Sequence, residues 1–321
     1  MNKYIATLLL GTLAWASTSC TDDFEEINTD PNRIDQISPG TLLNPTIYGI
    51  SSFCTDRADA FTFQVMQVAL PFPSANGGIH RYDISEGAGN STWSTYYRWL
   101  INIKEMETSA IENSDVNYEA IALTLRAYSL SQLTDSFGDI PMTEASRAED
   151  GIFQPAFDSQ EAVYTQIFQD LERANSLYDD TKAMIYGDDI LFHNDVEKWR
   201  KFTNSLHLRL LLRVSGRAEM NSFAKMASMI NNPEQYPVFQ NTAESAILQI
   251  TGVTPNLSPW GRAIDFTTFR SISEFFVDRL NALEDPRRAK FMTQARDIDG
   301  TTAIGYKGIP SGYNGNDNQF Q

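Results

Sequence analysis

The stretch from Tyr118 to Ala145, YEAIALTLRAYSLSQLTDSFGDIPMTEA, constrains the fold of this chain more than any other. Large side chains recur in it at helical steps among small Ala and Ser residues: Ile121, Leu125 and Tyr128. Small residues let neighbouring backbones approach, so the pattern predicts a helix packed on more than one side. Gly138 and Pro141 are expected to end it, because Gly tolerates a left-handed cap and Pro lacks a donor.

Length and charge limit the class of protein. The chain has 321 residues, of which 42% are hydrophobic, and this is enough for one large domain or two small ones. Its formal net charge of −16 argues against nucleic acid and anionic lipid headgroups as partners. The two cysteines, Cys20 and Cys54, cannot form a disulfide framework, and Cys54 is expected to be a small buried hydrophobe.

The N-terminus has the pattern of an exported protein. Residues 1–19 contain a short apolar run with the length of a signal-peptide apolar region, and small residues precede Cys20. We interpret residues 1–19 as a lipoprotein signal peptide and Cys20 as the lipid attachment site, with a plain secretory signal as the alternative. Residues 20–45 are acidic and then rich in Pro, Asn, Asp and Ser, which predicts an extended leader before a domain spanning residues 46–321.

Helical periodicity continues through most of residues 46–321. Segments 46–69 and 91–110 carry apolar stripes, and the second is the expected antiparallel partner of the helix that starts near Tyr118. A second helix pair is expected after two capping-box spacings, Asp158 with Glu161 and Asn194 with Glu197, and Trp199 in this pair is expected to be a core residue. A weaker helix is predicted over 220–230 and one strand over 246–250. Two such pairs predict a superhelix of tetratricopeptide-like units, although the repeat consensus is not met.

No sequence signature of catalysis or metal binding stands out. The three histidines, His80, His193 and His207, are not spaced for one metal ion, and His207 is expected in the core or at its rim. No zincin, P-loop, dinucleotide or nucleophile-elbow motif is present, so no cofactor is expected. Acidic pairs are frequent because the chain has 41 acidic residues, and Asp297 with Asp299 is better explained as a surface turn than as a calcium loop. Arg209 and Arg213 are interpreted as ties between helices.

Aromatic residues in irregular segments are the remaining candidates for a ligand site, because sugars and peptides stack on such rings. The long segment from Pro71 to Asn90 holds His80, Arg81 and Tyr82, and a second loop holds Trp260 and Arg262. We predict a ligand site formed by these five residues. Tyr306 and Tyr313 are weaker candidates, and Tyr313 is expected to matter less than Tyr82.

Several of these blocks resemble the SusD-like (SusD/RagB) family of nutrient-binding outer-membrane lipoproteins. The similar blocks are the FGDIP turn with its TEA segment, FQPAFDSQEAVYTQIFQDLERA, WRKFTNSLHLRLLLRVS, ISEFFVDRLNALEDPR and the GYKGIPSG segment. The resemblance implies a mainly α-helical fold, an α-superhelix of tetratricopeptide-like pairs with long loops and minor β structure. It also implies further helices after residue 321, so the C-terminal part of the family fold is expected to be missing.

The resemblance further implies a function. Such a protein would sit at the cell surface, anchored to the outer membrane, and would bind an oligosaccharide or peptide without breaking a bond. Its partner would be a SusC-like TonB-dependent transporter. Two alternatives stay open: a surface-tethered glycan hydrolase, and a helical scaffold that binds only protein.

Overall fold

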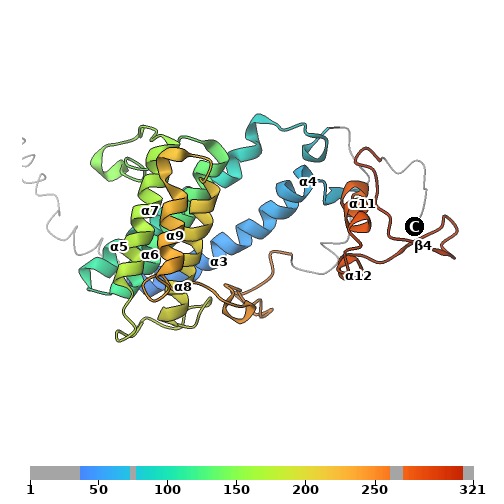
Figure 1. Cartoon of the computed structure of the whole chain (residues 1–321). Coiled ribbons are helices and arrows are strands. Elements are labelled where there is room, and N and C mark those ends of the chain that lie inside the picture. The colour runs from blue at the N-terminus through green and yellow to red at the C-terminus, as the bar shows by residue number, and fades with distance from the viewer. Residues whose placement is uncertain (1–36, 73–76, 261–269, 314–321) are drawn as a thin grey trace, which may run out of the picture. The chain divides into compact units, whose positions relative to one another are not determined.

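Helices dominate the computed structural model, which describes residues 37–72, 77–260 and 270–313 (Figure 1). The long helices are α3 (Pro39–Arg57), α5 (Asn90–Glu112), α6 (Val116–Phe137), α7 (Gln160–Leu177), α8 (Val196–Arg213), α9 (Ser222–Asn231) and α11 (Glu274–Ala282). Shorter pieces are a π-helical turn (Ala58–Thr62), α4 (Phe63–Val65) and α12 (Arg288–Phe291). The strands are β1 (Ala69–Pro71), β2 (Arg270–Ile272), β3 (Ala295–Arg296) and β4 (Ala303–Gly305). The predicted mainly α fold with minor β structure is confirmed.

Helix α6 has neighbours on several sides, as its small residues predict. Fifteen of its twenty-two residues are buried, and it packs against both α5 and α7. It ends at Gly138, which has a φ of 78° and donates its N–H to the carbonyl of Thr134 at 2.9 Å. The predicted helix and its stop are therefore confirmed.

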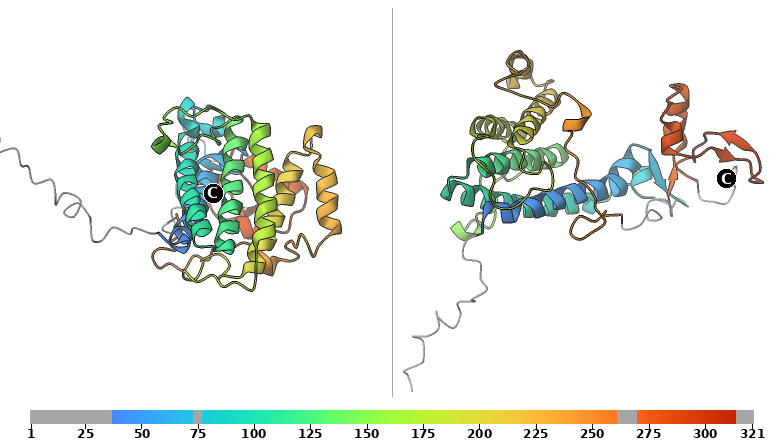
Figure 2. Two further views of the ribbon diagram at one scale, coloured as in Figure 1. Left: turned by 90° about the vertical axis from the view of Figure 1, so that its left-hand side faces the viewer. Right: turned by 90° about the horizontal axis from the view of Figure 1, so that it is seen from below.

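Successive helices from α5 to α9 each pack against the next one along the chain (Figure 2). Neighbours in sequence therefore bury each other's apolar stripes, as in helical-repeat folds, although the links 138–159 and 178–195 are long. Helix α3 adds a further layer by packing against α5. The core of this stack includes Trp199 and His207, whose side chains are 0% and 1% exposed. Burial lowers the pKa of His207 to about 4, so its ring is neutral at pH 7.

A charged cluster ties the three central helices together. The guanidinium of Arg126 on α6 makes two hydrogen bonds of 2.7 Å to the carboxylate of Asp170 on α7, and it also pairs with Glu107 on α5. Burial opposes the charge of Arg126, yet the bonds to Asp170 and the charge of Glu107 raise its pKa overall. Such a bidentate pair fixes the orientation of α6 relative to α7.

The start of α7 differs by one residue from its prediction. The N-cap is Ser159, whose hydroxyl accepts the N–H of Ala162 at 3.2 Å, and not Asp158. The Asp158 carboxylate instead accepts the N–H groups of Met142 and Thr143, and these bonds lower its pKa despite partial desolvation. Asp158 was therefore wrongly predicted as the N-cap, because its carboxylate oxygens accept hydrogen bonds from Met142 and Thr143 and not from the first turn of α7.

The start of α8 differs in the same way. Asp195 is the N-cap and accepts the N–H of Lys198 at 3.0 Å. The predicted cap, Asn194, has a φ of 60° and donates its amide to the carbonyl of Gly187 at 2.7 Å. Asn is one of the few residues that adopt this left-handed conformation at low cost, so it serves the loop before the helix.

One helix boundary and one strand also differ from the sequence predictions. Helix α3 begins at Pro39, inside the segment predicted to be extended, because proline at a first helical position loses no hydrogen bond. The predicted strand over 246–250 is wrong, since these residues form no ladder and Ile247 is 56% exposed.

Residues 1–36 lie outside the described residues, and the predictions on Cys20 and the signal peptide fall there.

A short antiparallel pair brings distant parts of the chain together. Ala69 lies opposite Ile272, and Pro71 lies opposite Arg270. The next residue, Ser273, forms a parallel bridge with Ile309. This chain of backbone hydrogen bonds places residues 309–313 within reach of the segment that follows β1.

Candidate functional site

The segment predicted to bind ligand is a single 3₁₀ turn, Ile79–Arg81, capped by Tyr82. The carbonyl oxygen of His80 accepts hydrogen bonds from the amide of Gln67 and the hydroxyl of Ser311, each at 2.8 Å. The imidazole of His80 is only 3% exposed, and burial together with the charge of Arg81 lowers its pKa. His80 therefore positions the turn and has little surface to offer a ligand.

Residues 311–313 pack directly against this turn. Arg81 donates from Nη2 to the carbonyl oxygen of Gly312 at 3.1 Å. The rings of Phe72 and Tyr313 stack with centroids 5.7 Å apart and an interplanar angle of 10°. Tyr313 thus lies beside the turn that carries Tyr82, and the expectation that it matters less than Tyr82 for binding stays a prediction.

Tyr82 offers the largest free aromatic surface of this site. Its side chain is 63% exposed, although its hydroxyl donates to the carbonyl of Val65 at 3.2 Å. Its φ of 59° is a left-handed conformation that costs free energy for a bulky residue such as tyrosine. The surrounding hydrogen bonds hold this conformation. We call Phe72, His80, Arg81, Tyr82, Ser311 and Tyr313 the loop cluster.

The second predicted loop is fixed through α3. Tyr48 donates its hydroxyl to the carbonyl of Leu257 at 3.0 Å, three residues before the half-buried Trp260. The backbone N–H of Trp260 donates a hydrogen bond to the hydroxyl of Ser258 at 3.2 Å. Arg262 lies outside the described residues, so the predicted pairing of Trp260 with Arg262 stays a prediction. The guanidinium of Arg288 lies over the ring of Tyr306, with 5.4 Å between the guanidinium carbon and the ring centroid.

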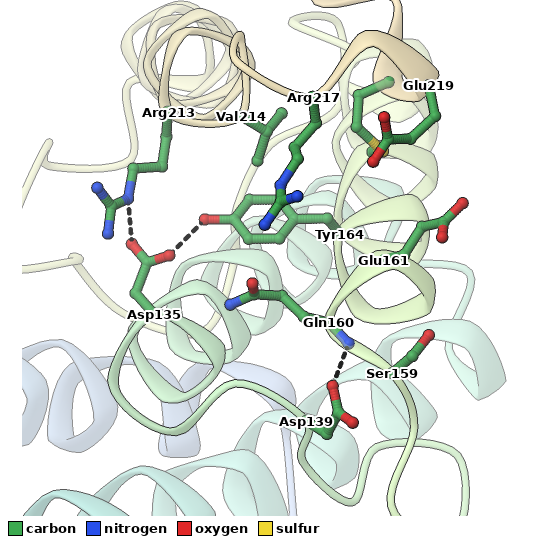
Figure 3. Close-up of a pocket in the computed structure, with 11 residues that line it drawn as sticks. Asp135, Asp139, Ser159, Gln160, Glu161, Tyr164, Arg213, Val214, Arg217 and Glu219 are labelled. Carbon is green, nitrogen blue, oxygen red and sulfur yellow. Dashed lines mark hydrogen bonds and ion pairs between the residues drawn. The ribbon is translucent and has the colours of Figure 1, made fainter.

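A polar pocket of about 500 Å³, which the sequence did not predict, lies where α6, α7 and α8 come together (Figure 3). On its floor Asp135 accepts hydrogen bonds from the Tyr164 hydroxyl at 2.7 Å and from Arg213 Nε at 3.0 Å. Burial and the neighbouring Asp135 raise the pKa of Tyr164. Asp139, in the FGDIP turn, accepts the backbone N–H of Gln160 at 2.9 Å at the start of α7.

Asp135 and Asp139 therefore hold helices in place. Arg213 is the tie between helices that the sequence predicts, whereas Arg209 is exposed. The turn Asp297–Thr302 likewise uses Asp297 to accept backbone N–H groups of Thr301 and Thr302, which agrees with a surface turn. Within residues 37–72, 77–260 and 270–313, no three His, Cys, Asp or Glu side chains are grouped to hold a metal ion.

Comparison with known proteins identifies the family. The profile of the SusD-like family described as starch-binding and associating with the outer membrane matches residues 31–321. The chain belongs to this SusD-like family. No curated protein matches it. In the described part of the chain, no helix is both long and apolar enough to cross a membrane.

Solved structures, among them one of a SusD homologue, share the fold. An outer-membrane protein from Bacteroides vulgatus, named for nutrient binding, is 27% identical, with a TM-score of 0.72 over 87% of this chain and 60% of its own. A SusD homologue from Bacteroides fragilis is 23% identical, with a TM-score of 0.68 over 86% of this chain and 58% of its own. A chitin-binding protein is 19% identical, with a TM-score of 0.71 over 88% of this chain and 64% of its own. The chain spans less than two thirds of the length of each.

Proposed function

We propose that this SusD-like protein is a cell-surface lipoprotein that binds a glycan, or another oligomeric nutrient, and delivers it to a SusC-like TonB-dependent transporter. Membership of a starch-binding, outer-membrane-associated family carries the proposal. The chitin-binding protein among the structures with this fold supports an oligosaccharide as the first ligand to test. The strong negative charge of the chain argues against nucleic acid as a partner.

The loop cluster is the proposed ligand site, with Trp260 and Arg262 as predicted contributors from the second loop. Tyr82 would stack its exposed ring on the apolar face of a sugar, while hydroxyl groups of the sugar meet polar neighbours. The side chain of Arg81 and the carbonyl of His80 are tied to residues 311–313. These ties keep Tyr82 in place before a ligand arrives, and such pre-organisation lowers the entropic cost of binding.

We infer that binding occurs without catalysis. A glycosidase needs two carboxyl groups that face the sugar and are free to exchange protons. In the polar pocket, Asp135 and Asp139 are each held by hydrogen bonds that fix the helices, so they are unsuited to exchange protons with a sugar. Glu161 and Glu219 also line this pocket and are the carboxylates to substitute if a hydrolase activity is found. A surface-tethered hydrolase remains the alternative, and product analysis after incubation with mixed glycans distinguishes the two. Binding to protein alone, in the manner of a helical scaffold, would give no signal on a glycan array.

Replacing Tyr82 with Ala is expected to weaken binding of the preferred oligosaccharide by about 1–3 kcal/mol, since a stacking face is lost. Alanine keeps the same backbone preference as tyrosine, so the fold of the turn should persist. Calorimetry with malto- and chito-oligosaccharides measures the change. Tyr82→Phe separates the two parts of the side chain, and it should bind like the parent because it keeps the ring.

Phe223→Ala is the matched control for this experiment. Phe223 lies on α9 and is 67% exposed, close to the 63% of Tyr82, but it is not in either predicted loop. It should leave binding unchanged. Parent-like affinity of Tyr82→Ala, with detectable glycan binding by the parent, would place the ligand elsewhere.

Replacing Cys20 with Ala is expected to release the protein from the membrane, because Cys20 is the proposed attachment point of the lipid. Fractionation of cells expressing each form gives the result, and Cys54→Ala is the control because its thiol lies against the hydroxyls of Tyr96 and Tyr128 inside the fold. The anchor proposal fails if Cys20→Ala stays with the outer membrane as firmly as the parent.

A further inference from the structure

A smaller pocket, of about 300 Å³, lies among α3, α5 and α6 and shares no lining residue with the loop cluster. Its polar lining includes Arg57, Thr62, Thr92, Gln132 and Ser136, beside the thiol-bearing Cys54 and the hydroxyl-bearing Tyr96. This pocket combines one cationic group with several hydroxyl and amide groups. We call it the Arg57 pocket.

Arg57 is held by an aromatic ring and lacks an acidic partner. Its guanidinium carbon lies 3.9 Å from the centroid of the Phe61 ring, and partial burial lowers its pKa. Among the described residues no carboxylate pairs with it, whereas Asp59, two residues further on, binds Arg270. Arginine stays charged at neutral pH, so this pocket carries a positive charge that no carboxylate of the described residues pairs with.

Thr92 supplies the second, independent observation. Its residue is only 5% exposed, and its hydroxyl oxygen has no hydrogen-bond partner in the described part of the chain. A buried hydroxyl without a partner destabilises a fold unless a ligand or water satisfies it. The unpaired hydroxyl and the unpaired guanidinium belong to residues that line the same pocket.

Two residues of this pocket, Thr92 and Ser136, are followed in the chain by aromatic residues that contact each other. Trp93, the residue after Thr92, packs edge-on against Phe137 at 5.2 Å and lies 6.1 Å from Phe157, whose ring is 63% exposed. Phe137 itself follows Ser136 of the pocket. Rings of this kind bind the apolar faces of sugars.

We propose that the Arg57 pocket is a second glycan subsite, which takes a sugar residue bearing an oxyanion, either a carboxylate or a sulfate. The inference rests on the proposed glycan-binding function and adds the class of sugar. The forked guanidinium of Arg57 matches two oxygens of such a group, and Thr92 and Gln132, which also line the pocket, carry groups that can donate further hydrogen bonds. The volume suits a single ring, at the lower end of ligand pockets. The net negative charge of the protein repels a bound anion only weakly, because salt screens charges that lie farther than about 8 Å from the pocket.

The test uses calorimetry with an oligosaccharide of galacturonic acid, its neutral methyl ester, and a sulfated galactan of similar length. The parent should bind at least one anionic probe about 10- to 100-fold more tightly than the methyl ester, which is the strength of a charged hydrogen bond. The anionic probe that binds more tightly than the methyl ester shows whether the pocket recognises a carboxylate or a sulfate. Arg57→Gln should abolish the preference.

Two variants make the result specific. Arg98→Gln removes the same charge from an exposed position on α5, and it should keep the preference. Thr92→Val keeps the shape but removes the unpaired hydroxyl, so it should fold at least as well as the parent and reduce the preference. Equal binding of anionic and neutral probes by the parent, or an unchanged preference in Arg57→Gln, would overturn the inference.

The experiment separates this inference from the proposed function. If neutral oligosaccharides bind and Tyr82→Ala weakens them while no anion is preferred, the proposed function stands and the Arg57 subsite falls. If neither neutral nor anionic glycans bind, both fall.

Discussion

Trp199→Ala is expected to lower the free energy of unfolding by about 3–5 kcal/mol, the range for removing a large aromatic side chain from a core. The ring is completely buried, and it packs edge-on against Phe192 with centroids 5.0 Å apart. Its indole N–H also donates to the carboxylate of Asp189 at 3.1 Å, and Asp189 is 2% exposed. Truncation therefore opens a cavity and also removes a donor from a buried carboxylate.

Denaturant unfolding of the purified protein measures this change. The control is again Phe223→Ala, since this ring is 67% exposed and its loss should cost less than about 1 kcal/mol. Losses of similar size in the two variants would show that Trp199 is not a core residue. If the Trp199 variant still folds, it should bind glycan like the parent, because it lies outside both proposed sites.

Asp170→Ala is the second large expected effect, with a loss of about 3 kcal/mol. Breaking a buried ion pair costs about 3–5 kcal/mol, because the remaining charge loses its partner. The low end applies here, since Glu107 still faces Arg126 after the substitution. The Asp170 side chain is 3% exposed and that of Arg126 is 27% exposed, so water can replace the lost bonds only in part.

Asp150→Ala provides the comparison. Asp150 pairs with Arg147 at 2.8 Å, but both side chains are largely exposed, at 57% and 43%. Exposed pairs contribute about 0–1 kcal/mol, so this variant should unfold almost like the parent. The interpretation of Arg126 as the tie among α5, α6 and α7 is wrong if the two substitutions have equal effects.

Local features of this fold could be predicted from sequence because they depend on neighbours along the chain. The alternation of small and large residues after Tyr118 indicated a helix with several neighbours, and α6 has them. Gly138 ends that helix because its φ of 78° suits glycine. The predicted N-caps of α7 and α8 were each wrong by one residue, because Asp158 and Asn194 form hydrogen bonds with residues outside those helices.

The sequence by itself determined the helical class, the approximate bounds of the main helices, the burial of Trp199 and the resemblance to the SusD-like family. Only the tertiary structure decided which residues meet: Tyr313 with Phe72 in the loop cluster, and Arg57 with Thr92 in the pocket among three helices. Periodicity and capping act over a few residues, so they can be read along the chain. The pairing of β1 with β2 joins segments about two hundred residues apart, and the packing of helix faces selects such contacts without leaving a local pattern in the sequence.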